Sequence, residues 1–152
     1  MHDTMIVLHA ATAVVCFVAG LAVLGLQTTR STWLPVYLAT LAGMTVFLAA
    51  AVAADWSEHD TGTRITFGAL TALALFMCWR GYRAAVELRT QPPGWRPRYL
   101  GHIGFTLISL FAGFVIVGAI DLGAPGWLVI LIAVVGVVVG IQLLNRAKAR
   151  YR

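Results

Sequence analysis

Five long stretches of the sequence are almost continuously apolar, and shorter polar segments separate them. None of them alternates between apolar and polar positions, which is the pattern of a β-strand with one solvated face. Each is close to the roughly 20 residues that a helix needs to cross the hydrocarbon core of a bilayer. A helix also satisfies its own backbone hydrogen bonds in lipid. The pattern predicts helices over residues 5–26, 34–54, 65–88, 99–120 and 126–144.

Composition assigns these helices to a membrane rather than to the core of a soluble domain. Hydrophobic residues make up 60% of the 152-residue chain, and charged residues make up only 11%. A soluble domain of this size has too much surface for its volume to bury so large an apolar fraction. The sequence therefore predicts an all-α, polytopic membrane helix bundle that forms a single domain over residues 1–152, with the lipid bilayer around it.

Basic residues gather at alternate ends of the predicted helices. Basic residues lie in the first connection, around the third connection and in residues 146–152, whereas acidic residues dominate the N-terminus and the other connections. By the positive-inside rule, this predicts an outside N-terminus and a cytoplasmic C-terminus, in a prokaryotic plasma membrane. Basic residues at membrane ends contact anionic lipid, and we expect no nucleic-acid partner. The residues expected to contact anionic lipid are Arg80, Arg83, Arg96 and Arg98.

The last turns of the third predicted helix carry charge on one side. Arg83 and Glu87 are four residues apart, so they can pair across one turn. We interpret this segment as a helix that leaves the membrane with its arginines reaching the interface. A gate or an anion contact made by Arg80 and Arg83 is the alternative.

A pattern led by histidine, His-x6-[Cys/Ser]-x2-Ala-Gly-x4-Gly, occurs twice. The two copies run through His9, Cys16, Ala19, Gly20 and Gly25, and through His102, Ser109, Ala112, Gly113 and Gly118. Residues seven and eleven positions apart lie on nearly the same side of a helix, so each copy forms a stripe, with Thr12 beside the first and Thr106 beside the second. An ionisable side chain within an apolar span is costly, which makes each histidine a candidate for function.

The predicted orientation sends the two copies through the membrane in opposite directions. The first two helices and the last two are therefore predicted to form an inverted repeat around the third, an architecture that recurs in transporters. Because the two histidines lie near opposite faces, about 20 Å apart, they cannot bind one metal or one haem iron together. Each can instead bond a carbonyl or water near the headgroups, as the alternative to a transport role. The residues expected to line a pathway are His9, Thr12, Cys16, Thr106, Ser109 and His102.

Several glycines are expected to let helices approach closely. Gly136 and Gly140 form a GxxxG pair in the last predicted helix. This pair fits either the seam of a homodimer or packing against another helix of the same chain. The full set of expected helix-packing positions is Gly20, Gly25, Gly113, Gly118, Gly136 and Gly140.

No cofactor is assigned from the sequence. Sulfur side chains lie at similar predicted depth near the bilayer centre, and they are Cys16, Met44, Met77 and Cys78. Soft sulfur ligands suit Cu(I), but they are also ordinary apolar fillers of helix bundles, and we favour packing. A haem or quinone site would have to use His9 and the loop residue His59.

Absent motifs leave three hypotheses for function. The sequence contains no His-Glu-x2-His, no phosphate-binding glycine loop and no Gly-x-Ser-x-Gly, so we do not expect an enzyme. The first hypothesis is a small transporter or channel-like protein that moves an ion or a small polar solute through the inverted-repeat interface. The second is a non-catalytic membrane subunit or assembly factor that binds a partner through glycine-rich helix faces. The third is a haem- or quinone-binding redox protein.

Overall fold

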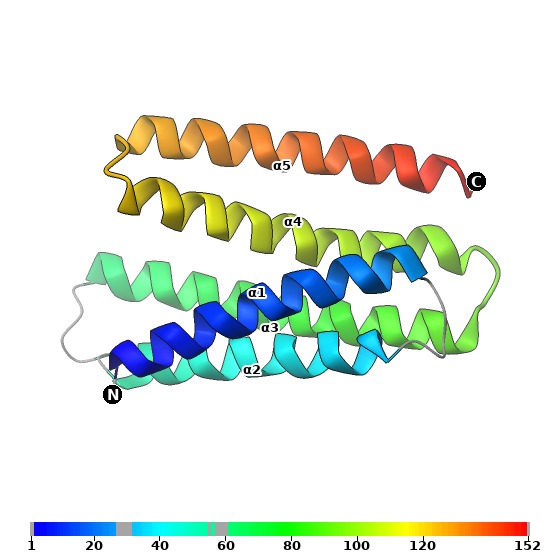
Figure 1. The fold of residues 1–152 in the computed structure, drawn as a ribbon, viewed down its shortest axis with the longest axis horizontal. Coiled ribbons are helices and arrows are strands. Elements are labelled where there is room, and N and C mark those ends of the chain that lie inside the picture. Colours follow the sequence, from blue (N-terminus) through cyan, green and yellow to red (C-terminus); the bar gives the residue numbers. More distant parts are fainter. Residues whose placement is uncertain (1, 27–31, 55, 57–60, 152) are drawn as a thin grey trace.

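The structure, a computed structural model, describes residues 2–26, 32–54, 56 and 61–151. All the regular secondary structure in these residues is helical (Figure 1). The helices are α1 (His2–Leu26), α2 (Trp33–Ala54), α3 (Thr61–Thr90), α4 (Trp95–Asp121) and α5 (Gly126–Ala149). Each of the five is long and apolar enough to cross a membrane. The all-α fold and the five long apolar helices are therefore confirmed.

The helices extend beyond the apolar runs that predict them. At its start, α4 begins at Trp95 rather than at residue 99, and α5 continues to Ala149 rather than ending at residue 144. Pro97 lies in the first turn of α4, where its missing N–H has no intrahelical partner to lose. Hydropathy thus marks the part of a helix that suits lipid, whereas the helix itself continues into the basic segments at its end.

A tight turn joins α3 to α4. The Gln91 N–H donates to the Glu87 carbonyl at 3.0 Å, and the Trp95 N–H donates to the Pro92 carbonyl at 2.9 Å. Gly94 has a φ of 69°, a left-handed conformation that glycine adopts without a steric penalty. The turn folds the first turn of α4 back beside the last turns of α3.

The first four helices form a closed bundle, and α5 lies outside it (Figure 1). Contacts link α1 to α2, α2 to α3, α3 to α4 and α4 back to α1. Within the described residues, α5 contacts only α4. The surroundings of the two helix pairs therefore differ, because α2 lies against α3 while α5 does not. The inverted repeat remains a prediction.

The core lies inside the four-helix bundle, around two tyrosines. Tyr37 of α2 and Tyr99 of α4 are both fully buried. A Cβ on Gly20 of α1 would lie 3.3 Å from the Tyr37 ring, and a Cβ on Gly81 of α3 would lie 3.5 Å from it. Glycine at these two positions therefore lets α1 and α3 close around the ring of Tyr37.

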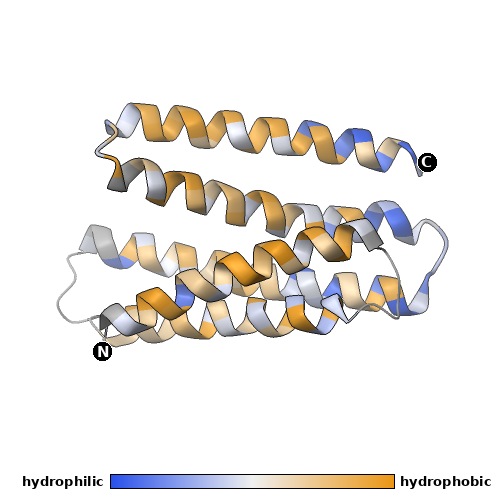
Figure 2. Cartoon of the chain, in the orientation of Figure 1, coloured by the Kyte–Doolittle hydropathy of each residue, from blue (hydrophilic) through white to orange (hydrophobic). Residues whose placement is uncertain are grey.

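The outward surfaces of the helices are apolar over most of their length (Figure 2). Large aliphatic side chains such as Val7, Val46, Ile130 and Leu131 are exposed. Among the described residues, polar and charged side chains concentrate at one end of the molecule, where the α3–α4 turn and the end of α5 lie. We call this the basic end.

Candidate functional site

The three candidate pathway residues on α1 are bonded to backbone carbonyls. The His9 ring donates from Nδ1 to the Met44 carbonyl of α2 at 2.9 Å. The Thr12 hydroxyl donates to the Leu8 carbonyl of its own helix at 2.7 Å. Cys16 is fully buried, with Sγ 3.8 Å from the Tyr37 carbonyl. His9 and Cys16 therefore contact carbonyls of α2, whereas Thr12 donates its hydrogen bond within α1.

The three candidate residues on α4 have different surroundings. Thr106 is fully buried and lies 3.4 Å from the His102 carbonyl of its own helix, whereas Ser109 is only half-buried. The His102 ring meets the Trp79 ring of α3 edge to face, with 6.4 Å between the ring centres. Its Nδ1 has no hydrogen-bond partner among the described residues.

Apolar groups and a buried hydrogen bond join α1 to α4. Phe17 and Phe114 meet edge to face at 5.8 Å. The Tyr99 hydroxyl donates to the Val23 carbonyl at 2.9 Å in a buried setting. Phe17 and Phe114 thus join the two helices near their middle, and Tyr99 and Val23 join them near the basic end. Neither histidine takes part in these contacts.

Equivalent positions of the two histidine-led copies differ in packing. A Cβ on Gly20 would lie 2.9 Å from Leu107 Cδ2 of α4. The equivalent Gly113 is exposed, and a Cβ there would meet nothing within 4 Å. The same open space surrounds Gly25 and Gly118.

The α5 glycines face α4 of the same chain. A Cβ on Gly140 would lie 2.7 Å from Ile108, and a Cβ on Gly136 would lie 3.3 Å from the Phe111 ring. Both glycines therefore allow α5 to approach the only helix that it contacts among the described residues.

Glu87 is paired with a residue of α4, so the predicted pairing with Arg83 is wrong. Arg98 donates from Nε and Nη2 to the two carboxylate oxygens, at 2.9 and 3.1 Å. The tight α3–α4 turn brings the arginine fork over this buried carboxylate, and a two-point contact satisfies both oxygens at once. The Arg83 guanidinium lies instead 6.0 Å from the centre of the Trp79 ring.

The other two arginines expected to contact lipid also have protein neighbours. Arg80 donates to the Gly101 carbonyl at 2.6 Å, and its guanidinium lies 5.0 Å from the centre of the Phe105 ring. The Arg96 guanidinium lies 5.5 Å from the centre of the Tyr151 ring. Arg80 therefore bridges α3 and α4, whereas Arg96 joins the start of α4 to the residues that follow α5.

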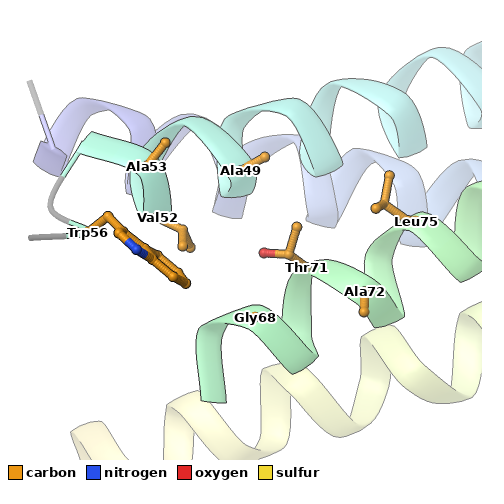
Figure 3. Close-up of a pocket in the computed structure, with 8 residues that line it drawn as sticks. All are labelled: Ala49, Val52, Ala53, Trp56, Gly68, Thr71, Ala72 and Leu75. Carbon is orange, nitrogen blue, oxygen red and sulfur yellow. The ribbon is translucent and has the colours of Figure 1, made fainter. Parts of the chain in front are cut away.

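A crevice opens between α2 and α3 at the end of the molecule opposite the basic end (Figure 3). The two helices are close near the middle, where Thr45 Oγ1 lies 3.2 Å from Cys78 Sγ. Towards the other end they flank an open groove of about 600 Å³. We call this groove the α2–α3 crevice. Its lining residues are Ala49, Val52, Ala53, Trp56, Gly68, Thr71, Ala72 and Leu75.

Small residues dominate the α2–α3 crevice. Ala49 and Ala53 are four residues apart on α2, and Gly68 and Ala72 are four apart on α3. Figure 3 shows Trp56, just beyond the end of α2, at one end of the crevice, where its ring centre lies 5.8 Å from the Arg64 guanidinium. The sequence reasoning missed this site because alanines resemble ordinary apolar filler. The signal that marks it is the spacing of small residues at i and i+4 on two successive helices.

Neither a metal site nor a relative identifies a function. In the part of the chain that the structure describes, no group of three or more His, Cys, Asp or Glu residues is placed to hold a metal ion. His59, the second residue of the haem hypothesis, lies outside the described residues. Comparison with protein-family models, with curated proteins and with solved structures gives no match.

Proposed function

We propose that this chain is an integral membrane protein whose basic end lies in the cytoplasm. Its five helices have the length and the apolar surface that lipid requires. Arg96, Arg98, Arg146 and Lys148 all lie at the basic end, as the positive-inside rule requires of a cytoplasmic end. Alkaline carbonate extraction tests the insertion: the protein stays in the membrane pellet if it spans the bilayer, and release into the supernatant would contradict insertion.

We propose further that the protein is a non-catalytic membrane subunit that binds a transmembrane helix of a partner in the α2–α3 crevice. The observation that carries this proposal is the crevice itself, with one pair of small residues on each wall. In lipid, helices associate mainly through close packing, and small residues four apart let two backbones approach. An open space between two such walls suits a third helix.

The interior of the bundle supports this role ahead of transport. A pathway between α1 and α4 would need polar side chains that face a shared space. Instead, His9 bonds the Met44 carbonyl, Cys16 lies fully buried, and Phe17 packs on Phe114. Opening this seam would break the buried hydrogen bond from Tyr99 to Val23.

Cross-linking in native membranes, followed by purification, tests the partner site. Gly68→Leu fills the crevice, and a Cβ at this position meets nothing within 4 Å, so the change should not disturb the fold. Gly113→Leu is the matched control, because its surroundings are equally open and it lies outside the crevice. We expect one membrane protein to be captured by the wild type and the control, and to be lost with Gly68→Leu.

Proteoliposome flux separates this role from transport. We expect no flux of protons, metal ions or small polar solutes through the wild-type protein. Flux that His9→Ala and His102→Ala both abolish, together with unchanged capture in Gly68→Leu, would replace the proposed function with the transport hypothesis.

A further inference from the structure

A second cavity, at the basic end, lies among α1, α4 and α5. It has a volume of about 520 Å³, within the range of small-molecule sites. The backbones of α1 and α5 are not adjacent in the described residues, and both helices lie beside α4. The cavity is therefore a groove with α4 as its floor, and Gly25 of α1 and Leu144 of α5 are among the residues of its walls. We call it the α1–α5 groove.

The groove matches one leaflet of a bilayer in length. Along α5 and the residue that caps its end, the lining runs from Gly140 to Arg150, ten residues apart, which is about 15 Å at the helical rise. The hydrocarbon core of a bilayer is about 30 Å thick, so this is about half of it. The lining between these two ends is aliphatic, with Leu107 and Leu144 among its side chains. Such a space suits a single acyl chain.

Positive charge surrounds the mouth of the groove. Arg150 and Tyr151 line it, and Arg96 lies over the ring of Tyr151. Lys148 reaches across to α4, where a Cβ on Gly101 would lie 2.9 Å from its Nζ. Residues 95–108 and 136–152 contain no aspartate or glutamate. The mouth therefore favours a ligand with an anionic headgroup.

We propose that an anionic phospholipid of the cytoplasmic leaflet occupies the α1–α5 groove. One acyl chain lies between α1 and α5, and the phosphate lies at Arg150 and Tyr151. Basic pockets between transmembrane helices on the cytoplasmic side recognise lipid headgroups through this chemistry. The lipid joins α5, which among the described helices lies beside α4 alone, to the rest of the bundle. This inference depends on the membrane insertion proposed above and is independent of the partner at the α2–α3 crevice.

Native mass spectrometry of the full chain in detergent, after removal of lipid, tests the proposal. The protein is titrated with phosphatidylglycerol or with phosphatidylcholine, and retained lipid is counted. We expect one retained phosphatidylglycerol and much weaker retention of phosphatidylcholine. Because a ligand that binds only the folded state stabilises it, phosphatidylglycerol should also raise the melting temperature more than phosphatidylcholine does.

Two variants separate the acyl-chain site from the headgroup site. Gly25 lines the groove and a Cβ on it meets nothing within 4 Å, so Gly25→Leu should fill the groove without a clash. Gly118→Leu is its control, since it is equally open and lies outside the groove. Arg150→Gln should weaken binding of phosphatidylglycerol about fivefold, the effect of one basic residue near an anionic surface. Arg146→Gln, a change at an exposed residue outside the groove, is the charge control.

The proposal is overturned by any of three results. Phosphatidylglycerol retained equally by wild type and Gly25→Leu would place the acyl chain elsewhere. Equal affinity for the two lipids, unchanged by Arg150→Gln, would remove the headgroup site. A protein that co-purifies with the wild type and is released by Gly25→Leu, with no lipid bound, would make the groove a protein interface. Loss of capture by Gly68→Leu bears only on the α2–α3 crevice, so the two proposals can fail separately.

Discussion

Replacing Tyr99 by phenylalanine is expected to destabilise the bundle, whereas the same replacement at Tyr37 should have little effect. Both tyrosines are fully buried. The Tyr99 hydroxyl donates to the Val23 carbonyl at 2.9 Å, whereas the Tyr37 hydroxyl lies near the Thr106 side chain and makes no well-formed hydrogen bond among the described residues. Both variants therefore remove one buried hydroxyl oxygen, but only Tyr99→Phe breaks the hydrogen bond to the Val23 carbonyl.

The position of Val23 sets the magnitude. It is the fourth residue from the end of α1, in the last turn, where helical carbonyls lack an intrahelical donor. Tyr99→Phe thus leaves a buried carbonyl without its side-chain donor. A buried unsatisfied group costs about 1–3 kcal/mol, and hydrogen bonds between membrane helices are worth about 0.6–1.7 kcal/mol. We expect a loss of about 1–2 kcal/mol in the free energy of unfolding, a factor of about 5–30 in the equilibrium constant.

Equilibrium unfolding in mixed micelles, with increasing SDS and tryptophan fluorescence as the signal, measures this difference. Tyr37→Phe should stay within about 0.5 kcal/mol of the wild type, because no well-formed hydrogen bond is lost there. An equal loss of stability in Tyr99→Phe and Tyr37→Phe would refute the reasoning, because the loss would then come from changed packing and not from the hydrogen bond. Tyr82→Phe, at an exposed residue of α3, controls for the substitution itself.

Two further predictions concern packing. Gly81→Leu should separate α2 from α3 and lower stability by about 1–3 kcal/mol in the same unfolding assay, because a Cβ on Gly81 would already lie 2.8 Å from Leu41 Cδ2. Gly113→Leu should be tolerated, and equal losses in the two variants would contradict the packing described here. In timed maleimide labelling read by mass spectrometry, Cys16, which is fully buried, should react more slowly than the half-buried Cys78. Labelling of Cys16 in the folded protein as fast as in SDS would show that the core around it is open.

The pairing of Glu87 shows where sequence reasoning stops. The spacing along one helix predicted Arg83 as the partner of Glu87, because positions four apart are neighbours on a helix surface. The structure instead uses Arg98, which is eleven residues away and belongs to the next helix. A tight turn with a glycine at positive φ sets that encounter, and helical periodicity contains no information about it.

The candidate site was hidden for a related reason. Histidine is rare in an apolar sequence, so the pattern indicated His9 and His102 as candidates. Ala49, Ala53 and Gly68 gave no such signal, because alanine and glycine are common in membrane helices. A crevice forms where two helices diverge. Small lining residues leave the space between such helices unfilled. Its sequence signal, small residues four apart, is also common in helices that pack without any gap.

The sequence by itself determined the helical class, the five long apolar helices and the concentration of charge beyond their ends. These properties follow from the length, hydropathy and charge of each segment alone. Only the tertiary structure decided that four helices close a bundle with α5 outside, that Tyr99 reaches Val23 and that two cavities open between helices. The physical reason is that lipid is as apolar as the helix surfaces, so hydropathy does not choose which faces meet. Close packing at glycines and a few buried hydrogen bonds make that choice, and they join residues as far apart in the sequence as Val23 and Tyr99.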